Sequence, residues 1–559
     1  MRYPIISLLS YIIVLLFISF IFLQCQSNTS LGIYVITNFG ARADGTLITK
    51  SLQQAIDVCH EHGGGSVIIP PGEFITGAVQ LRSNVSLKLE NGAILKGSLD
   101  TADYRINGIR HGMIYAQHVT NVSIAGQGII DGNGTAFMVP DRSHVSADFG
   151  REYTRQGDKF MPDGTLFEDG PTAYDFRPGM TVVILSSSNI TIRDVTFRDA
   201  PEWTIRFGEC DGVVVDGISI YNNLMIPNSD GIHCTASRNV RISNCDIRAG
   251  DDAIIVTGFP NSIGVDGTDE LRDKNLGKEK PGNTSGYAEN VTVTNCILQS
   301  RSAGIRIGYG SIPIRNCTFE NLVIYESNRG IGVFARDNAD IKNIHFNNII
   351  IQTRIHSGHW WGNGEPIHIS SIPQNLEIPV GKISDISFSN ITAEAETGMV
   401  IYAFEQGLVK NVHLENIYLT IFPGKHVIDY GGNLDLRPSF NKEYAIFQYN
   451  ISGLLIKNIQ HLEVDNFDLS WEENIPEYFN HGISIEVSSH ILIKEFSGRE
   501  PHTGTKNAAI SIMGSNNTLV KDSYAKPGTG IFVILTNDQG LHKMENNYTE
   551  NAKIVRKHY

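Results

Sequence analysis

The sequence predicts an all-β protein, a single-stranded right-handed parallel β-helix with a short helix over its N-terminal end. From about residue 180 onward, short segments alternate β-branched and polar residues, as strands do. Such segments start at residues 188, 211 and 238, so they recur after 23 and 27 residues, the length of one turn of a solenoid. Helical periodicity is nearly absent, and Gly or Asn stand where the coil must bend with positive φ.

The repeated strands define the turns of the coil, which we call rungs. Equivalent strands of successive rungs are expected to pair in parallel about 4.8 Å apart, so equivalent residues form ladders along the coil. The clearest strands are Ser188–Val195, Asp211–Ile218, Arg238–Cys245, Glu289–Cys296, Asp340–Asn348, Lys382–Asn390 and Leu408–Asn416.

The best candidate for a helix is Thr49 to His62, which three glycines end before the apolar strand Ser66–Pro70. A helix here would cover the open end of the solenoid, where strand edges and core are otherwise exposed. Segments 135–180 and 258–288, and also 424–447, interrupt the repeat and are expected to border the binding face. We find no linker, so residues 26–559 are predicted to form one monomeric β-helix domain.

Residues 1–25 are predicted to direct export. Arg2 precedes an apolar run from Ile5 to Leu23 that ends at Cys25, a pattern typical of a signal peptide or a lipoprotein signal with lipid on Cys25. An uncleaved anchor is the alternative, since the run nearly suffices to span a bilayer. In each case we expect the rest of the chain in the periplasm, on the cell surface or outside the cell.

Charge and cysteine content exclude several classes of protein. The net charge is −14 and no basic run occurs, which argues against nucleic acid as a partner. The seven Cys form no C-x-x-C pair, which disfavours a zinc or thiol enzyme. Three Asn-Cys pairs close equivalent strands, and we interpret these Cys as buried packing residues.

The most informative residues are acidic. Asp230, in Asn228-Ser-Asp230-Gly, lies 21 residues before Asp251, in Gly250-Asp251-Asp252. Because 21 residues are close to one rung, the three carboxylates are expected to converge, and their repulsion should raise at least one pKa. Such a group can combine a general acid with a general base, which in an inverting glycosidase stand about 6.5–9.5 Å apart. Turn-forming Asp residues and a Ca²⁺ site are the alternatives.

These motifs resemble glycoside hydrolase family 28, the polygalacturonase family, whose pattern is Asn-x-Asp followed about 20 residues later by Gly-Asp-Asp. Tyr34–Gly45, Gly64–Gly72 and Ala200–Ile205 also resemble segments of that family, so the resemblance covers roughly residues 33–420. It implies an inverting hydrolase on a right-handed β-helix, without metal or cofactor. It also implies that Asp251 is the general acid, that Asp230 and Asp252 activate the water, and that Asn228 shapes the site.

The chain departs from the family at two motifs. Ala303 stands where the family has the His of Gly-His-Gly, and Gly332 to Phe334 stand where it has Arg-Ile-Lys, whose cations grip a galacturonate carboxylate. Arg306 is the strongest candidate to replace those cations, ahead of Arg329 and Arg336.

The loop from His356 to His368 holds adjacent Trp residues, Trp360 and Trp361. Both cannot face the core from one strand, so one is expected to stack on a sugar ring. The alternative is that they pack under the loop.

The sequence thus predicts a glycosidase that acts on pectin-like polysaccharides or oligosaccharides of galacturonan or rhamnogalacturonan type. Long loops beside the site favour exo-action. One alternative is a polysaccharide lyase, which would need a cation, usually Ca²⁺, and a base. The other is a carbohydrate-binding β-helix without catalytic activity.

Overall fold

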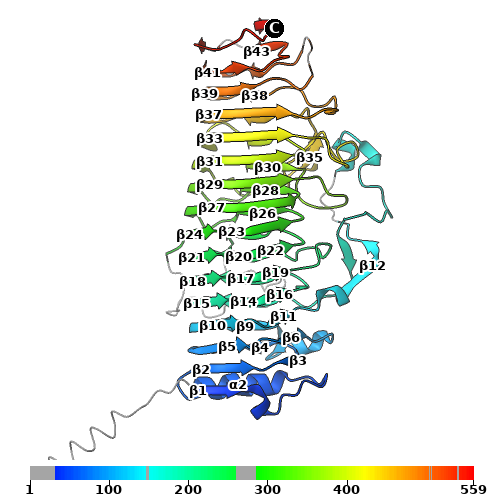
Figure 1. Cartoon of the computed structure of the whole chain (residues 1–559), viewed down its shortest axis with the longest axis vertical. Helices are drawn as coiled ribbons and strands as arrows, with labels where there is room; N and C mark the ends of the chain where they lie inside the picture. Colours follow the sequence, from blue (N-terminus) through cyan, green and yellow to red (C-terminus); the bar gives the residue numbers. More distant parts are fainter. Residues whose placement is uncertain (1–31, 146–149, 260–284, 503, 505, 538–539) are drawn as a thin grey trace, which may run out of the picture.

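The computed structural model describes residues 32–145, 150–259, 285–502, 504, 506–537 and 540–559. They form one long coil in which parallel strands stack along a single axis (Figure 1). The predicted right-handed parallel β-helix is confirmed. In this topology the chain returns to the same sheet by the right-handed crossover that twisted strands favour.

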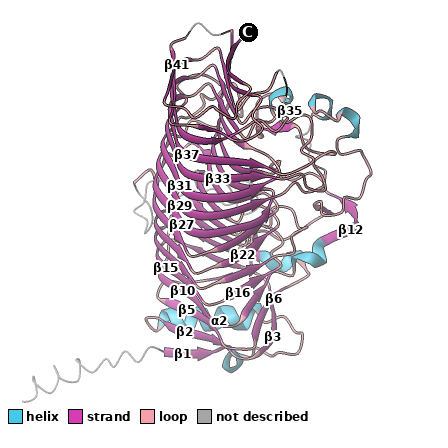
Figure 2. Ribbon diagram, turned by 45° about the horizontal axis from the view of Figure 1, so that its top comes forward, coloured by secondary structure: helices cyan, strands magenta, loops and turns pink. Residues whose placement is uncertain are grey.

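Most strands belong to two parallel sheets, which we call sheet A and sheet B. Sheet A is the larger and forms the stack seen in Figure 2. Its strands are β1 (Gly32–Val35), β2 (Gly65–Ile69), β3 (Gly72–Thr76), β5 (Val85–Leu89), β6 (Ala93–Gly97), β10 (Thr120–Gly126), β11 (Ile129–Asp131), β15 (Ser188–Arg193), β16 (Thr196–Arg198), β18 (Asp211–Asp216), β19 (Ser219–Tyr221), β21 (Arg238–Ser243), β22 (Asp246–Ala249), β24 (Ala288–Thr294), β25 (Ile297–Ser300), β27 (Ile314–Ser327), β29 (Ile341–Thr353), β31 (Ile383–Ala395), β33 (Val409–Ile421), β37 (Gln460–Trp471), β39 (Ser489–Gly498), β41 (Asn516–Lys521), β42 (Tyr524–Ala525) and β44 (His542–Glu545).

Sheet B carries the candidate site, because its strands and the loops before them present the acidic residues. Its strands are β4 (Val79–Gln80), β9 (Ile114–Gln117), β14 (Val182–Leu185), β17 (Ile205–Gly208), β20 (Ile232–Thr235), β23 (Ile254–Gly258), β26 (Ala303–Gly310), β28 (Arg329–Ala335), β30 (Glu365–Ser371), β32 (Met399–Ala403), β36 (Leu454–Lys457), β38 (Ile483–Glu486), β40 (Ile510–Met513), β43 (Ile531–Thr536) and β45 (Ile554–His558).

The core lies inside the coil and is built from ladders of identical residue types. Phe346 stacks on Phe319 at 5.1 Å and on Phe388 at 4.6 Å between ring centroids. Cys245, Cys296 and Cys317 are buried and free, as their interpretation as packing residues requires. In sheet A, alternation of buried and more exposed residues along strands such as β29 and β31 turns every second side chain into this core.

Asparagine ladders hold the corners of the coil. Asn390, Asn416 and Asn466 each have φ between 54° and 58°, a conformation that Asn adopts more readily than most residues. The Asn416 side-chain amide donates to Asn390 Oδ1 at 3.0 Å, and the Asn466 amide donates to Asn416 Oδ1 at 2.8 Å. Each rung thus bonds to the next through side chains as well as backbone.

Helix α2 (Thr49–Glu61) covers the N-terminal end of the coil, as predicted, and ends one residue before the expected His62 (Figure 1). Leu52, Ala55, Ile56 and Cys59 are buried against the first rungs. Among the described residues, the structure has no helix whose length and apolar character would let it cross a bilayer. Cys25 and the predicted export segment lie outside the described residues.

Two of the predicted interruptions meet on one side of the coil. In 135–180, β12 (Met138–Ser143) pairs with β13 (Thr172–Tyr174), and in 424–447, β34 (Asn433–Asp435) pairs with β35 (Ile446–Gln448). Arg155 joins the two segments, since its guanidinium donates to Gly432 O at 3.2 Å and to Tyr449 O at 3.1 Å. Figure 2 shows β12 and β35 on the same side of the stacked strands. Most of the interruption 258–288 lies outside the described residues.

Candidate active site

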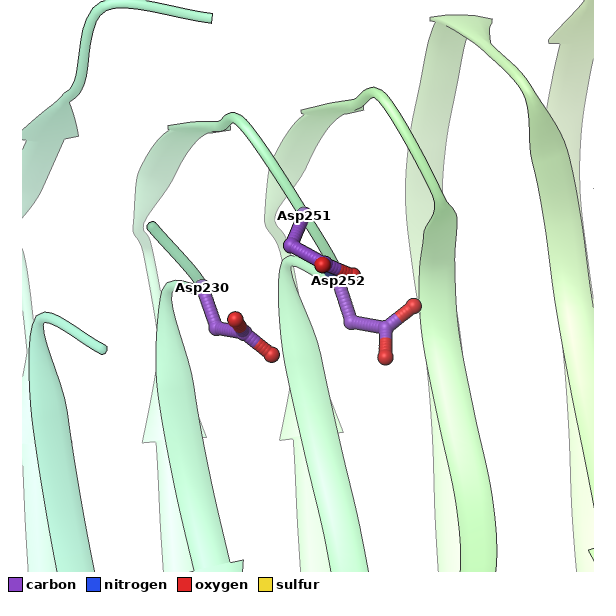
Figure 3. A group of neighbouring side chains, drawn as sticks. All are labelled: Asp230, Asp251 and Asp252. Carbon is purple, nitrogen blue, oxygen red and sulfur yellow. The ribbon is translucent and has the colours of Figure 1, made fainter. Parts of the chain in front are cut away.

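The three predicted acidic residues converge on sheet B. Asp230 lies two residues before β20, and Asp251 and Asp252 lie directly before the neighbouring strand β23. Ile232 pairs with Ile254, so Asp230 and Asp252 occupy equivalent positions on adjacent rungs. One carboxylate oxygen of each of the three residues lies within 4.8 Å of the others, and the side chains gather on one side of the sheet (Figure 3).

The nearest carboxylate oxygens lie closer together than the separation of about 6.5–9.5 Å that we expected between acid and base. They lie within 4.8 Å because residues at equivalent ladder positions are separated by only one strand spacing. The three carboxylates are therefore closer together than the inverting mechanism predicted.

Burial and mutual repulsion perturb two of the carboxyl groups. Asp251 is 8% exposed, and burial together with the charge of Asp252 raises its pKa to about 7. Burial and the charges of Asp251 and Asp252 also raise the pKa of Asp230 well above its ordinary value. Asp251 can thus carry a proton near neutral pH beside two other carboxyl groups, the arrangement that a general acid and a general base require.

Arg306 of β26 stabilises the third carboxylate. Its Nε forms an ion pair with Asp252 Oδ2, and the Ala303 backbone N–H donates to Asp252 Oδ1 at 2.9 Å. The Arg306 guanidinium also lies over the Tyr309 ring at 4.5 Å, while its buried Nη1 has no hydrogen-bond partner among the described residues. A donor thus remains available to a molecule in the cavity.

The altered family motifs lie beside this ion pair. Ala303 directly follows Asp252 in the ladder of equivalent positions, and Arg306 is paired with Gly332 on the next rung. The cation therefore stands one rung before the position at which the family pattern places its arginine. Arg329 also lines the cavity, but it is 3% exposed and bound to Glu365 at 3.2 Å. Arg336 is buried and donates to Ser370 O and Leu436 O instead.

His233 is a site residue that the sequence analysis missed. Its Nε2 lies 2.8 Å from Asp230 Oδ2, and its ring stacks on Trp203 at 3.5 Å and 8°. Burial, with the charges of Arg306 and Arg206, holds the pKa of His233 well below its ordinary value, so the ring is neutral. The signal was present in the strand register, since His233 pairs with Ile255 and Ile255 pairs with Arg306, so both residues lie on one ladder of sheet B.

The aspartates open into a cavity of about 200 Å³. Its wall combines aromatic with polar and charged side chains, and the residues that line it are Trp203, Asn228, Asp230, Asp251, Asp252, Phe259, Ser302, Arg306, Tyr309, Arg329, Phe334 and Trp361. Phe334, which replaces a cation of the family pattern, stacks on Tyr309 at 6.0 Å. The cavity thus offers flat apolar surfaces beside a carboxylate cluster.

Asn228 lies where the sequence placed it. It lines the cavity with φ of 55°, and Arg177 Nη2 donates to its Oδ1 at 2.9 Å. Arg177 belongs to the interruption 135–180, which therefore helps to fix this edge of the cavity.

Of the two adjacent tryptophans, only Trp361 lines the cavity. The prediction for Trp360 as a residue that stacks on sugar is wrong, because it is 3% exposed and its Nε1–H donates to Asp169 O at 2.8 Å. Asp169, from the interruption 135–180, also accepts from the Ser357 backbone N–H at 2.8 Å. These contacts turn Trp360 away from the cavity.

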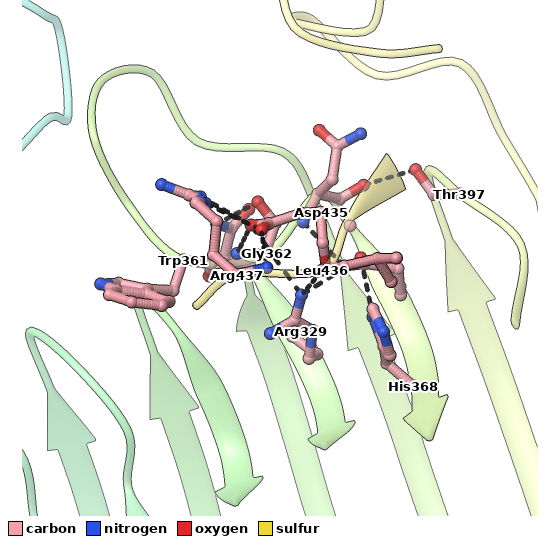
Figure 4. A network of polar contacts seen from close by, with 12 residues as sticks. Arg329, Trp361, Gly362, His368, Thr397, Asp435, Leu436 and Arg437 are labelled. Atoms are coloured by element: carbon pink, nitrogen blue, oxygen red, sulfur yellow. Dashed lines mark hydrogen bonds and ion pairs between the residues drawn. The ribbon is translucent and has the colours of Figure 1, made fainter. Parts of the chain in front are cut away.

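A buried network lies beside Trp361, and we call it the end wall (Figure 4). Arg437 binds Asp435 through Nε and Nη2 at 2.8 and 2.6 Å, and Asp435 accepts from the Gly362 N–H at 2.7 Å. The Arg437 guanidinium lies 5.2 Å from the Trp361 ring. The end wall therefore fixes the loop that presents Trp361.

Among the described residues, the three aspartates also lie close enough together to be considered as ligands of a metal ion. The donor set fits poorly, because the Arg306 guanidinium already binds Asp252 and its positive charge opposes a second cation there.

Comparisons with known proteins give matches over the part of the chain that holds the site. Residues 175–430 match the model of Glycosyl hydrolases family 28. An exo-poly-α-D-galacturonosidase of Dickeya chrysanthemi is 28% identical over 336 residues, which cover 51% of this chain and 55% of that protein. A probable polygalacturonase of Vitis vinifera is 25% identical over 262 residues, covering 44% and 47%. The chain thus spans about half the length of these curated relatives.

The solved structure of a family 28 exopolygalacturonase from Yersinia enterocolitica has a TM-score of 0.55 and 20% identity, and covers 89% of this chain and 79% of that one. An exopolygalacturonase from Thermotoga maritima has a TM-score of 0.52 and 18% identity, covering 78% and 92%. These likenesses show the fold. The fold and the carboxylate cluster define a parallel β-helix that carries an acidic site on one of its sheets. Within this fold, residues 175–430 are similar to glycosyl hydrolases family 28.

Proposed function

We propose that this protein is an inverting glycoside hydrolase that cleaves glycosidic bonds in pectin-like polysaccharides or oligosaccharides. The observation that carries the proposal is the cluster of Asp230, Asp251 and Asp252, in which one carboxylate is paired with Arg306 and the other two have raised pKa values. The family and the curated relatives support the same reaction.

In the proposed reaction, Asp251 donates its proton to the glycosidic oxygen as the bond to the anomeric carbon breaks. Asp252 accepts a proton from the attacking water, and Asp230, held by His233, positions that water. The Ala303 N–H and Arg306 keep Asp252 oriented. At the end of the cycle the proton moves from Asp252 through solvent back to Asp251.

Two features support attack by water rather than by a carboxylate. Asp252 is bound by a guanidinium, which reduces its nucleophilicity, and burial with the charges of Asp251 and Asp252 raises the pKa of Asp230, which opposes its ionisation. Both effects disfavour a carboxylate as the nucleophile of a covalent intermediate. Hydrolysis should therefore invert the anomeric carbon, despite the short distances within the cluster.

We propose a rhamnogalacturonan-type substrate, in which acidic and neutral sugars alternate, over plain galacturonan. Gly332 and Phe334 supply no cation, and Arg329 is already bound to Glu365. Arg306 Nη1, a donor of a cavity cation that has no hydrogen-bond partner among the described residues, fits a single uronate group. Phe334 and Trp361 fit the apolar face of a neutral sugar.

The end wall supports exo-action. Asp435 and Arg437 fix the loop that presents Trp361 to the cavity, and in the proposed mode the sugar chain ends at this loop. The Dickeya chrysanthemi relative is named an exo-acting enzyme, which favours the same mode.

The deciding experiment incubates the protein with galacturonan, rhamnogalacturonan and neutral galactan while reducing ends and ultraviolet absorbance are followed together. New reducing ends without unsaturated products support the hydrolase, and proton nuclear magnetic resonance of the first product gives its anomer. Unsaturated products that vanish with a chelator would instead establish the lyase. A protein that binds these polymers but releases nothing would be the non-catalytic alternative.

We further propose that the chain is exported, lipidated at Cys25 and monomeric. The apolar run before Cys25 supports export, and the capped solenoid supports a monomer. Labelling cells with a radioactive fatty acid should mark the wild type and not Cys25→Ala, and light scattering should give the mass of one chain.

A further inference from the structure

Behind the end wall, the outer face of sheet B carries a second hollow, which we call the distal trough. It consists of two adjoining cavities of about 400 and 630 Å³ that share Asn480, Glu486 and Met513. The residues that line it are Arg155, Gln448, Tyr449, Asn450, Lys457, Asn480, His481, Ser484, Glu486, Lys506, Ser511, Met513, Ile534, Thr536 and Tyr559.

The distal trough and the catalytic cavity lie on the same face of one sheet. A single ladder of paired residues runs from Phe334 in the cavity through Ser370 and Tyr402 to Lys457 and Glu486 in the trough. Four strand steps of about 4.8 Å separate Phe334 from Glu486, or about 19 Å. A polymer that follows sheet B would therefore meet both sites.

The side chains that line the trough carry a net positive charge. Glu486 is its carboxylate, and it is already bound by Lys457 at 3.0 Å and by the Tyr449 hydroxyl at 2.7 Å. Arg155 donates to backbone carbonyls and to Asn450 Oδ1, none of them an acid. Lys506 is exposed and pairs with no acidic side chain in the part of the chain that the structure describes.

Two cations thus face the trough without an acidic partner, in a chain whose net charge is −14. Burial lowers the pKa of His481 to about 4, so this ring adds no charge near neutral pH. A local positive field of this kind favours an anionic ligand.

The remaining lining fits sugar. The amides of Gln448, Asn450 and Asn480 can pair with hydroxyl groups, and the rings of Tyr449 and Tyr559 offer faces for apolar sugar edges. The elongated shape, formed by two joined cavities, suits several sugar units in a row.

We propose that the distal trough binds a uronate-bearing stretch of polysaccharide and so anchors the polymer on the enzyme about 19 Å from the site of cleavage. This inference rests on the proposed function, because it takes the anchored polymer to be the one that is cleaved. Anchoring raises the effective concentration of polymer at the catalytic cavity without altering the chemical step.

The test measures binding of an α-1,4-linked galacturonate hexamer by calorimetry, in an Asp251→Asn background that prevents turnover. Lys506→Glu combined with Asn450→Asp places two negative charges in the trough, and both positions are exposed, so folding should be preserved. We expect the dissociation constant to rise at least tenfold. Lys543→Glu, an exposed charge reversal outside the trough, should leave the dissociation constant unchanged.

In the active protein, the trough variant should cleave short oligosaccharides at the normal rate and dilute polymer several-fold more slowly. The inference would be overturned if the trough variant and Lys543→Glu bound the galacturonate hexamer equally well. It would also be overturned if the protein with an unaltered trough bound a neutral galactose hexamer as tightly as the galacturonate hexamer. If the trough variant weakens binding while wild-type protein hydrolyses nothing, the anchoring site stands and the proposed function fails.

Discussion

His233 Nε2 and Asp230 Oδ2 lie 2.8 Å apart, and neither residue is more than 2% exposed. The pair is closed from one side by the ring of Trp203. An ionised Asp230 accepts a hydrogen bond from the ring, whereas a protonated Asp230 donates one, so the neutral His serves either state. His233 therefore acts as a positioning residue for the water-holding carboxyl group.

Replacing His233 tests this role. His233→Ala leaves a buried carboxyl without its partner, at a cost of about 1–3 kcal/mol, so kcat should fall roughly ten- to a hundredfold. His233→Gln, whose amide nitrogen can take the place of Nε2, should recover part of the rate. Both variants should be compared over pH, because loss of the ring should also move the pH profile. An unchanged profile and rate in His233→Ala would contradict the role.

Asp251→Asn should abolish hydrolysis with little effect on folding. Removing a general acid costs about 10²–10⁴ in rate, and Asn keeps the size of the side chain. The matched control is Asp246→Asn, which changes a carboxylate on β22 of the same rung that points away from the cavity toward Arg248. Reducing-end assays and thermal melting of both variants check the result, and comparable loss in the two would argue against Asp251 as the acid.

The pH dependence follows from the raised pKa of Asp251. The acid must be protonated to act, so kcat should decline above pH 7, where a pKa of about 7 leaves it ionised. Asp252→Asn removes the charge that most raises this pKa after burial, and leaves Arg306 to lower it further. In the pH–rate profile of Asp252→Asn, the decline of the residual activity at high pH should therefore begin at a lower pH than in the wild type. A decline that stays in place would show that another group controls it.

Trp361→Ala should weaken substrate binding while leaving the chemistry intact. Loss of one stacking surface is worth about 1 kcal/mol, so KM should rise roughly fivefold with kcat nearly constant. Trp361→Phe keeps a ring and should behave almost as the wild type. Kinetics on oligosaccharides separate the two constants, and a fall in kcat alone would place Trp361 in a different role.

Asp435→Asn should destabilise the end wall. The variant removes the carboxylate that pairs with the buried Arg437 and lies 4.0 Å from Arg329. Loss of one partner of a buried ion pair typically lowers the free energy of unfolding by about 3–5 kcal/mol. Asp465→Asn, which breaks a partly exposed pair with Lys494, should cost only about 0–1 kcal/mol. Melting temperatures of the two variants check the difference. Products of Asp435→Asn should also include longer fragments, as the side of the cavity near Trp361 opens.

Much of the fold could be predicted, because its information is local and repeated. Alternating strands, Asn corners and a spacing of one rung between Asp230 and Asp251 suffice to place the acidic cluster on one sheet. The sequence did not reveal which of the two adjacent aspartates is equivalent to Asp230. Strand pairing puts Asp252, rather than Asp251, opposite Asp230. That offset of one residue depends on how each turn is closed.

The loops account for what the sequence left open. Which of Trp360 and Trp361 faces the cavity is decided by Asp169, some 190 residues earlier in the chain, through its backbone carbonyl. The end wall likewise joins Gly362 to Asp435 across two separate segments. Contacts of this kind arise from loop geometry and leave no periodic signal, whereas His233 sits in a regular strand and its side could have been worked out by alternation.

The asparagine ladder makes neighbouring turns interchangeable at their corners. Asn390, Asn416 and Asn466 have the same backbone conformation and bond to one another in the same way, so each accepts any other as its neighbour. The length of the molecule is then fixed by the number of copies and not by the shape of any one of them. A gene that gains or loses a whole turn at this corner can lengthen or shorten the protein without having to invent a new interior.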